Sequence, residues 1–399
     1  MKKIIISIML STPVGLCAAS PEPSKVYTPY FDMSLTEAGY LPSNGNIFSG
    51  ALIDTRAGFL LNLAEKHGLF MLYSFNYSGP GFSPQDTKQF TDRSMTHSFN
   101  MEYRYKVSDR LRLRPAFNFG NSYRRMGTNE SWKNGLYNNK NTGGQLSLDY
   151  TFDADNGGNA TLSILSRSIK FPNYTDLLLE FQNPGAAAEV GGGLYDQTMT
   201  QYSLRPSWHN FFGGISITSQ KYKKQKVIDT GGAYGSSKQK DTDTSMDIGM
   251  KHRLWIFELY PSLIYTVHSS NQNFMRYKSS VDTSPVFIKD AYSYKEMSFV
   301  LPLDLNVTSK WAIGGSLSTT KRTYDSRPPR DSNNDYVAGK KQDNTFSTAT
   351  MSIKKMINEV AYVRLFYSIT KASSNNKFEA YMPYNYTGSS FGLTYGITY

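Results

Sequence analysis

Apolar and polar residues alternate with a period of two in many segments of the chain. The segment 95–107 shows this most clearly, because its odd positions from Met95 to Val107 are large and, apart from His97, apolar or aromatic, whereas its even positions are polar. Successive side chains of a β-strand point to opposite faces, so each such segment predicts a strand with one apolar and one polar face. Comparable segments occur at 111–123, 145–152, 246–254, 259–267, 299–307, 311–317, 351–353 and 361–369. The pattern predicts an all-β fold built from antiparallel hairpins.

Short turns and long polar stretches alternate between these predicted strands. We expect short turns near 65–68, 108–110, 153–158, 209–210, 255–256, 309–310 and 356–358. We expect long loops at about 78–93, 124–142, 172–196, 223–242, 270–290, 325–343 and 372–387. With a first strand at 30–36 the count is sixteen strands; fourteen is the alternative if residues 27–50 form a separate arm or plug. In the strand 159–171 the apolar positions change parity, which predicts a β-bulge near Ser166.

The last nine residues carry the most regular alternation in the chain. Large apolar residues occupy one face, and only glycine and threonine occupy the other. The apolar residues are Phe391, Leu393, Tyr395, Ile397 and Tyr399. This ending resembles the closing strand of bacterial outer-membrane β-barrel proteins, which end in an aromatic residue with apolar residues two positions apart.

The resemblance implies a single transmembrane antiparallel barrel with porin-like architecture, short periplasmic turns and long extracellular loops. It places the protein in the bacterial outer membrane, in contact with membrane lipid and lipopolysaccharide. It also implies that the barrel assembly machinery recognises the five apolar residues of the last strand as its signal.

The first residues have the composition of a secretory signal peptide. Lys2 and Lys3 precede an apolar stretch from Ile4 to Leu16, and small residues up to Ala19 offer a cleavage site. We therefore expect removal of residues 1–19 and a single barrel domain over residues 20–399. The only cysteine would leave with the signal, so we expect neither disulfides nor thiolate chemistry in the mature chain.

Composition agrees with a two-faced barrel wall. Mean hydropathy is −0.46 although aromatic residues make up 14 % of the chain, as expected for strands with one wet face and one lipid face. The formal charge of +11 includes the two lysines of the predicted signal, whose loss leaves 41 basic against 32 acidic side chains. This excess either solubilises exposed loops or attracts anionic solutes and lipopolysaccharide phosphates. No nucleic-acid-binding motif is present, and we expect no nucleic acid partner.

Basic residues outnumber acidic residues on the polar face, which a barrel turns inward. Four of them lie on two adjacent predicted strands near the periplasmic end, with Glu102 beside them. This predicted lumen basic cluster consists of Arg104, Lys106, Arg112 and Arg114. It favours a water-filled pore with weak anion selectivity. The alternative is a network of salt bridges that fills a non-conducting lumen.

No constellation of residues predicts catalysis or a metal site. His97 has residue types nearby that outer-membrane phospholipases use, but they occupy the opposite strand parity. These neighbours are Ser94, Ser98 and Asn100. A segment that begins at Asp331 opens like a calcium loop, but Tyr336 stands where the loop requires glycine. We expect no enzyme activity, no catalytic residue, no cofactor and no dedicated metal site.

The sequence thus predicts a porin-like channel for passive diffusion of small hydrophilic solutes, anions included. The alternative is a non-conducting structural or surface-interaction barrel whose loops bind a partner or a polysaccharide. Three adjacent leucines at 177–179 make loop 172–196 unusual. This loop either folds into the lumen as a constriction or packs on the rim of the barrel or against a partner.

Overall fold

The computed structural model describes residues 26–42, 48–80, 92–125, 131–175, 192–277, 284–379 and 383–399, and within them the chain forms β-strands and no helix. The first ten strands are β1 (Tyr27–Pro42), β2 (Phe48–Ala64), β3 (His67–Pro80), β4 (Arg93–Lys106), β5 (Leu111–Arg125), β6 (Asn139–Asp153), β7 (Gly158–Lys170), β8 (Gln197–Trp208), β9 (Phe211–Ile228) and β10 (Tyr234–Met250). The others are β11 (His252–Leu254), β12 (Phe257–Leu259), β13 (Ser262–Ser270), β14 (Phe274–Arg276), β15 (Val286–Ile288), β16 (Tyr294–Asn306), β17 (Trp311–Tyr324), β18 (Asp343–Met356), β19 (Ala361–Ser374) and β20 (Tyr386–Thr398). Residues 1–25 lie outside the described ranges, so removal of residues 1–19 stays a prediction.

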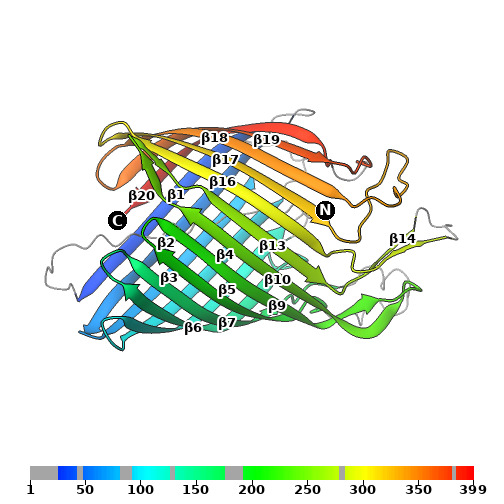
Figure 1. Cartoon of the computed structure of the whole chain (residues 1–399), viewed down its shortest axis with the longest axis horizontal. Coiled ribbons are helices and arrows are strands. Elements are labelled where there is room, and N and C mark those ends of the chain that lie inside the picture. The colour runs from blue at the N-terminus through cyan, green and yellow to red at the C-terminus, as the bar shows by residue number, and fades with distance from the viewer. Residues whose placement is uncertain are drawn as a thin grey trace.

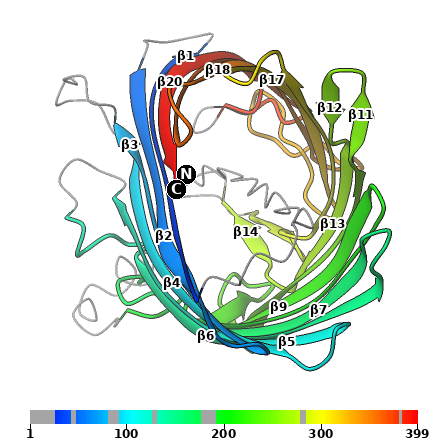
Figure 2. The ribbon, with the colours of Figure 1, turned by 90° about the vertical axis from the view of Figure 1, so that its left-hand side faces the viewer.

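The strands close into one antiparallel barrel, seen from the side in Figure 1 and end-on in Figure 2. Each strand of the wall pairs with the next one along the chain, and β1 pairs with β20. The short strands β11 and β12 continue β10 and β13 around a tight turn, so the wall has sixteen strands. This confirms the predicted fold. The alternative of fourteen strands is wrong, because residues 27–42 belong to the wall.

The seam between β1 and β20 joins residues close to the two ends of the described chain, and its register is unbroken. Beyond the last paired strand residue, the backbone of Tyr399 exchanges two hydrogen bonds with Phe31, at 2.7 and 2.8 Å. On the inner face, the Oγ1 atoms of Thr36 and Thr394 lie 2.8 Å apart, and both side chains are buried. The terminal strand is therefore paired up to its final residue.

The glycines of β20 make room for rings of the neighbouring strand β19. A Cβ added to Gly396 would lie 2.2 Å from the Tyr362 ring, and one added to Gly392 would lie 2.7 Å from the Phe366 ring. Both rings therefore lie across glycines on the inner face of the seam. A strand glycine commonly marks such a close approach, so the small face of the terminal segment reflects packing.

The outer wall carries a belt of exposed apolar side chains. Met351 is 70 % exposed and Leu365 is 59 % exposed, values that a water-soluble protein seldom allows for neighbouring large apolar residues. Exposed rings gather where the short turns lie. They include Trp208, Phe211, Trp255 and Trp311. An apolar band edged by rings is the surface that a barrel presents to lipid, and the polar faces of the strands accordingly turn inward.

Short turns and long loops lie at opposite ends of the barrel. The turns at 65–66, 107–110, 154–157, 209–210, 255–256, 307–310 and 357–360 agree with the predicted positions. The long loop predicted at 223–242 is wrong, because β9 and β10 extend as a hairpin to a tip at 229–233. One face of this extension packs against the polar side chain of Gln272, which donates hydrogen bonds to Lys226 and Gln239. Both faces are therefore polar, and the sequence lacks the apolar alternation by which the other strands are recognised.

The β-bulge predicted near Ser166 is also wrong. Strand β7 keeps an unbroken register with β6 and β8 through this position. Leu165 and Ile169 share the inward parity with Arg167, and Leu165 is buried. The apolar positions change parity here because the inner wall near the loop end carries apolar side chains as well.

Replacing Gly396 with valine should destabilise the barrel by about 1–3 kcal/mol, because the added side chain meets the ring of Tyr362. The double variant Gly396→Val, Tyr362→Ala should recover most of that loss, since the three atoms nearest the added Cβ all belong to this ring. The measurement is the urea midpoint of unfolding of the refolded barrel in neutral detergent, with Tyr362→Ala as the control. Strictly additive losses in the double variant would contradict this packing.

Candidate functional site: the lumen and its mouth

Two arginines of the predicted lumen basic cluster meet on one glutamate. Arg114 donates hydrogen bonds to both oxygens of Asp149, at 2.7 and 2.9 Å, and to Glu102 Oε2 at 2.9 Å. Arg104 donates to the other oxygen of Glu102 at 2.7 Å. The two arginines and two carboxylates form a charge-neutral network across β4, β5 and β6. The sequence alone did not place Asp149 beside the cluster, because the register of β6 against β5 is a tertiary property.

The other two members of the cluster lie nearer the short-turn end. Lys106 pairs with Asp109 at 2.7 Å, and its hydrogen bond and charge hold the pKa of this exposed carboxyl below its ordinary value. Arg112 stands opposite Lys106 on one side and Asp149 on the other. Within the described residues, no ion pair joins Arg112 to an acidic group. Arg112 is thus the member of the cluster whose charge has no ion-pair partner among the described residues.

Looser charge pairs line the inner wall on β8 to β12. Arg205 lies 3.7 Å from Asp247, and Lys251 lies 3.8 Å from Glu258. The side chains of the two basic residues remain 60 % and 54 % exposed, respectively. Side chains packed across the lumen would bury these groups, so water reaches the inner wall in this region.

A small hairpin leans across the mouth at the loop end. The hairpin β14–β15 lies at that end of the barrel in Figure 1, and β14 lies inside the ring of strands in Figure 2. Arg276 of β14 donates a hydrogen bond to the backbone oxygen of Asn334 and lies over the Tyr336 ring, 4.7 Å from its centroid. The hairpin is thereby joined to the loop between β17 and β18. It occurs within the loop predicted at 270–290, and its short strands were not predicted.

The loops at the mouth pack around a core of their own. We call the described parts of loops 271–293, 325–342 and 375–385 the cap. Ala291 is 0 % exposed and Asn376 is 1 % exposed. Asn376 accepts a hydrogen bond from the Arg330 backbone N–H at 2.8 Å, and the Arg330 guanidinium lies 4.8 Å from the centre of the Phe378 ring. The cap is therefore a packed structure with buried residues and not a set of solvated loops.

Arginine and tyrosine side chains alternate within the cap and at its edge. Arg327 lies over the rings of Tyr324 and Tyr292, at 4.3 and 5.3 Å, and donates to the backbone oxygen of Ala291 at 3.2 Å. Burial raises the pKa of the Tyr292 phenol, although the Arg327 charge acts in the opposite direction. Desolvated contacts of this kind between a cation and a ring contribute on the order of 2 kcal/mol each.

Loop 172–196 is described only at its two ends. There, Tyr174 stacks on Tyr195 with 3.8 Å between ring centroids. Residues 176–191, which include the leucines at 177–179, lie outside the described residues. The prediction that this loop narrows the lumen or packs on the rim therefore stays a prediction.

Strand geometry separates His97 from the neighbours that suggested a hydrolase. The His97 ring lies on the outer wall, where its Nδ1 is 2.7 Å from the Tyr73 hydroxyl. The suggested partners occupy the other parity of β4 and so face the lumen. They are Ser94, Ser98 and Asn100. The absence of enzyme activity stays a prediction.

The segment resembling a calcium loop is a hydrogen-bonded turn. Asp331 Oδ1 accepts hydrogen bonds from the backbone N–H groups of Asn333 and Asp335, both at 2.9 Å. Across the part of the chain that the structure describes, no group of three or more His, Cys, Asp or Glu side chains could hold a metal ion. In the same part, no helix is long and apolar enough to cross a membrane.

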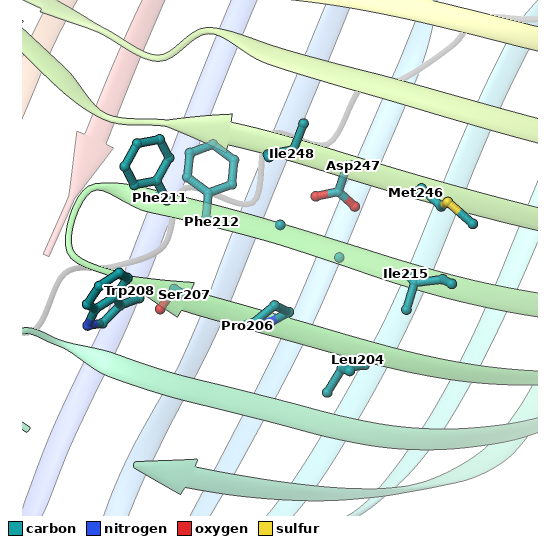
Figure 3. A pocket seen from close by; sticks show the side chains of 12 residues that line it. Leu204, Pro206, Ser207, Trp208, Phe211, Phe212, Ile215, Met246, Asp247 and Ile248 are labelled. Atoms are coloured by element: carbon teal, nitrogen blue, oxygen red, sulfur yellow. The ribbon is translucent and has the colours of Figure 1, made fainter. Parts of the chain in front are cut away.

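A hollow of about 410 Å³ lies on β8, β9 and β10 near the short-turn end (Figure 3). Pro206 has no N–H group, and the pairing of β8 with β9 lapses between Leu204 and Ser207. Most lining residues are apolar and several belong to the outer belt, among them Leu204, Ile215, Met246 and Ile248. This lining suits hydrocarbon better than a hydrophilic solute.

A membrane is the one environment that suits the closed backbone pairing, the exposed apolar belt and the charged interior together. The protein is a bacterial outer-membrane β-barrel. No protein-family model and no curated protein matches its sequence.

Several solved structures resemble this chain at very low sequence identity. One is the in-vitro folded outer membrane protein OmpT of Vibrio cholerae in a trimer form, with a TM-score of 0.48 and 8 % identity over 94 % of this chain and 100 % of that one. Another is the toluene transporter TodX of Pseudomonas putida, with a TM-score of 0.38 and 8 % identity over 95 % and 90 % of the two chains. The CymD monoaromatic hydrocarbon channel has a TM-score of 0.39 and 7 % identity over 93 % and 88 %. These similarities concern the fold alone.

Replacing Arg276 with alanine should loosen the cap, because it removes both the hydrogen bond to Asn334 and the contact with the Tyr336 ring. Amide hydrogen exchange in β14 and β15 should become at least about ten-fold faster, since these short strands have few other contacts to hold them closed. The matched control is Lys340→Ala, an exposed residue of the adjoining loop. Unchanged exchange in Arg276→Ala would contradict the role of this contact.

Proposed function

We propose that the barrel is a porin-like channel for passive diffusion of small hydrophilic solutes, with a preference for anions. Charged side chains of the inner wall that stay in contact with water support this function most directly. Arg205 and Lys251 face the lumen with more than half of their side-chain surface exposed. A solvated, charged wall suits hydrophilic solutes, because they exchange bulk water for lumen water and polar groups at little cost.

The preference for anions follows from which charges are neutralised. The acidic residues Glu102, Asp149 and Glu296 each pair closely with an arginine. Arg112 and Arg364 lie on the inward parity and, within the described residues, have no ion pair. A lumen with low-dielectric walls focuses such unpaired charge on the solute path. The packed cap at the loop end favours small solutes.

A non-conducting barrel that binds a partner through the cap is the second candidate. The packed core of the cap, with arginines that lie over aromatic rings, favours this function. A surface that is already ordered can bind a partner without the entropic cost of ordering its loops. The channel and the surface-interaction barrel differ in whether ions cross the lumen.

Reconstituted into planar bilayers, the refolded barrel should show stable single-channel currents in potassium chloride. Under a salt gradient, the reversal potential should report an anion permeability above that of the cation. A barrel that inserts and is correctly folded, as judged by heat-modifiable mobility, but never conducts would refute the channel. That outcome would leave the surface-interaction barrel.

Reversing the charge of Arg112 should lower the ratio of anion to cation permeability at least about two-fold, because it converts the unpaired cation of the cluster into an anion. Arg112→Gln should give an intermediate ratio. Arg114 is unsuitable for this test, since its reversal would place a third carboxylate between Glu102 and Asp149. The control is Lys371→Glu, the same charge change on the outer parity of β19. An equal shift in the control would mean that Arg112 does not act on the lumen.

A further inference from the structure

Lysines gather on the outer wall where four strands leave the apolar belt. They lie on β6, β7, β9 and β10, and all seven are exposed. We call this group the lysine patch. It consists of Lys140, Lys170, Lys221, Lys223, Lys226, Lys238 and Lys240. Within the described residues, none of them forms an ion pair.

Strand register places these positive charges directly against one another. Lys140 stands opposite Lys170, and Lys221 stands opposite Lys240. Higher on the same hairpin, Lys226 stands opposite Lys238. Like charges in directly opposed positions destabilise a sheet. Three opposed lysine pairs in one region therefore indicate that an anion from outside the protein binds there.

One side chain links the two halves of the patch. Lys223 of β9 reaches across β8, and its Nζ lies 3.5 Å from the Ser168 hydroxyl oxygen. Ser168 lies two positions from Lys170 on the same face of β7. A nearby carboxylate, Asp196, accepts a hydrogen bond from the Phe171 backbone N–H at 2.7 Å and has no ion pair with a described lysine of the patch. The seven cations thus form one continuous surface.

The patch lies at the height of the lipid headgroups. A strand tilted by about 40° climbs about 2.5 Å per residue, so an apolar band about 25 Å tall spans about ten residues. Lys140, Lys170, Lys221 and Lys240 each stand ten positions along their strands from Tyr150, Ala160, Phe211 and Met250, which lie toward the short-turn end. The patch therefore meets the membrane surface at the loop end, which faces outward from the cell.

We propose that the lysine patch binds the phosphate groups of the phosphorylated glycolipid in the outer leaflet, a lipid of the lipopolysaccharide type. Its phosphates lie at the level of the patch, and each ammonium group near an anionic membrane surface adds to the attraction. Two or more phosphates on one headgroup match lysine pairs on separate hairpins. This inference depends on the membrane location of the barrel and is independent of whether the lumen conducts.

Binding of bisphosphorylated lipid A to the refolded full-length barrel in neutral detergent tests the proposal. The wild-type barrel should bind this lipid at least about ten-fold more tightly than its dephosphorylated form, and high salt should weaken the binding. The variant Lys221→Gln, Lys240→Gln should lose about ten-fold in affinity, and so should Lys140→Gln, Lys170→Gln. The matched control is Lys66→Gln, Lys310→Gln, which removes two lysines from the short-turn end.

Stability in detergent without lipid separates binding from a structural role. Removing an opposed lysine pair should leave the urea midpoint unchanged or raise it, because the like-charge contact is lost. Equal affinity for the phosphorylated and dephosphorylated lipids would overturn the proposal. So would an equal loss in the control variant, or full competition by inorganic phosphate at the concentration of the lipid.

Discussion

The barrel depends on one constraint: every backbone N–H and C=O group inside the hydrocarbon has to find a partner within the protein. The pairing of β1 with β20 meets this constraint at the one place where the two ends of the sheet come together. If this seam were open, two strand edges would face lipid, and each unpaired group would cost several kcal/mol. The hydrogen bonds between Phe31 and Tyr399 show how far the pairing extends, since they involve the last residue of the chain.

Closure of the seam also determines which side chains the last strand can carry. Its outer face holds the large apolar residues that meet lipid, and its inner face accepts the rings of Tyr362 and Phe366 from β19. The pattern of glycine and threonine at the terminus is therefore the counterpart of two rings on the neighbouring strand. One segment satisfies lipid on one side and the packing of the inner wall on the other.

Inward charges are paired tightly at some places on the wall and loosely at others. Toward the short turns, Glu102 and Asp149 hold Arg114, whereas Arg205 and Lys251 pair loosely and stay more than half exposed. Toward the loops, Arg322 is held by Glu296 at 2.7 Å, and Arg327 and Arg330 lie over rings inside the cap. The loop end is therefore packed, whereas part of the inner wall toward the short turns stays exposed.

Much of the fold could be predicted from the chain alone, because the period of two reports local geometry. The strands, the short turns and the membrane-facing parity follow from alternation such as that of 95–107, which holds wherever one face meets lipid and the other meets water. The same rule fails in the extension of β9 and β10 beyond the belt, where both faces carry polar side chains. It fails again at Leu165, which is apolar and yet faces inward. Neither place has the combination of lipid on one face and water on the other that produces the alternation.

The candidate site depended on information that no single strand contains. The sequence identified Arg104, Lys106, Arg112 and Arg114 as inward and basic, but only the register between strands brings Asp149 to Arg114 and leaves Arg112 without an ion pair among the described residues. The cap joins loops that are far apart in the chain, as Arg276 and Tyr336 illustrate. The sequence by itself thus determined the barrel and the face that most strand side chains take, because both follow from neighbours along one strand. The tertiary structure alone decided which charges are neutralised and how the mouth is covered, because those contacts join distant parts of the chain.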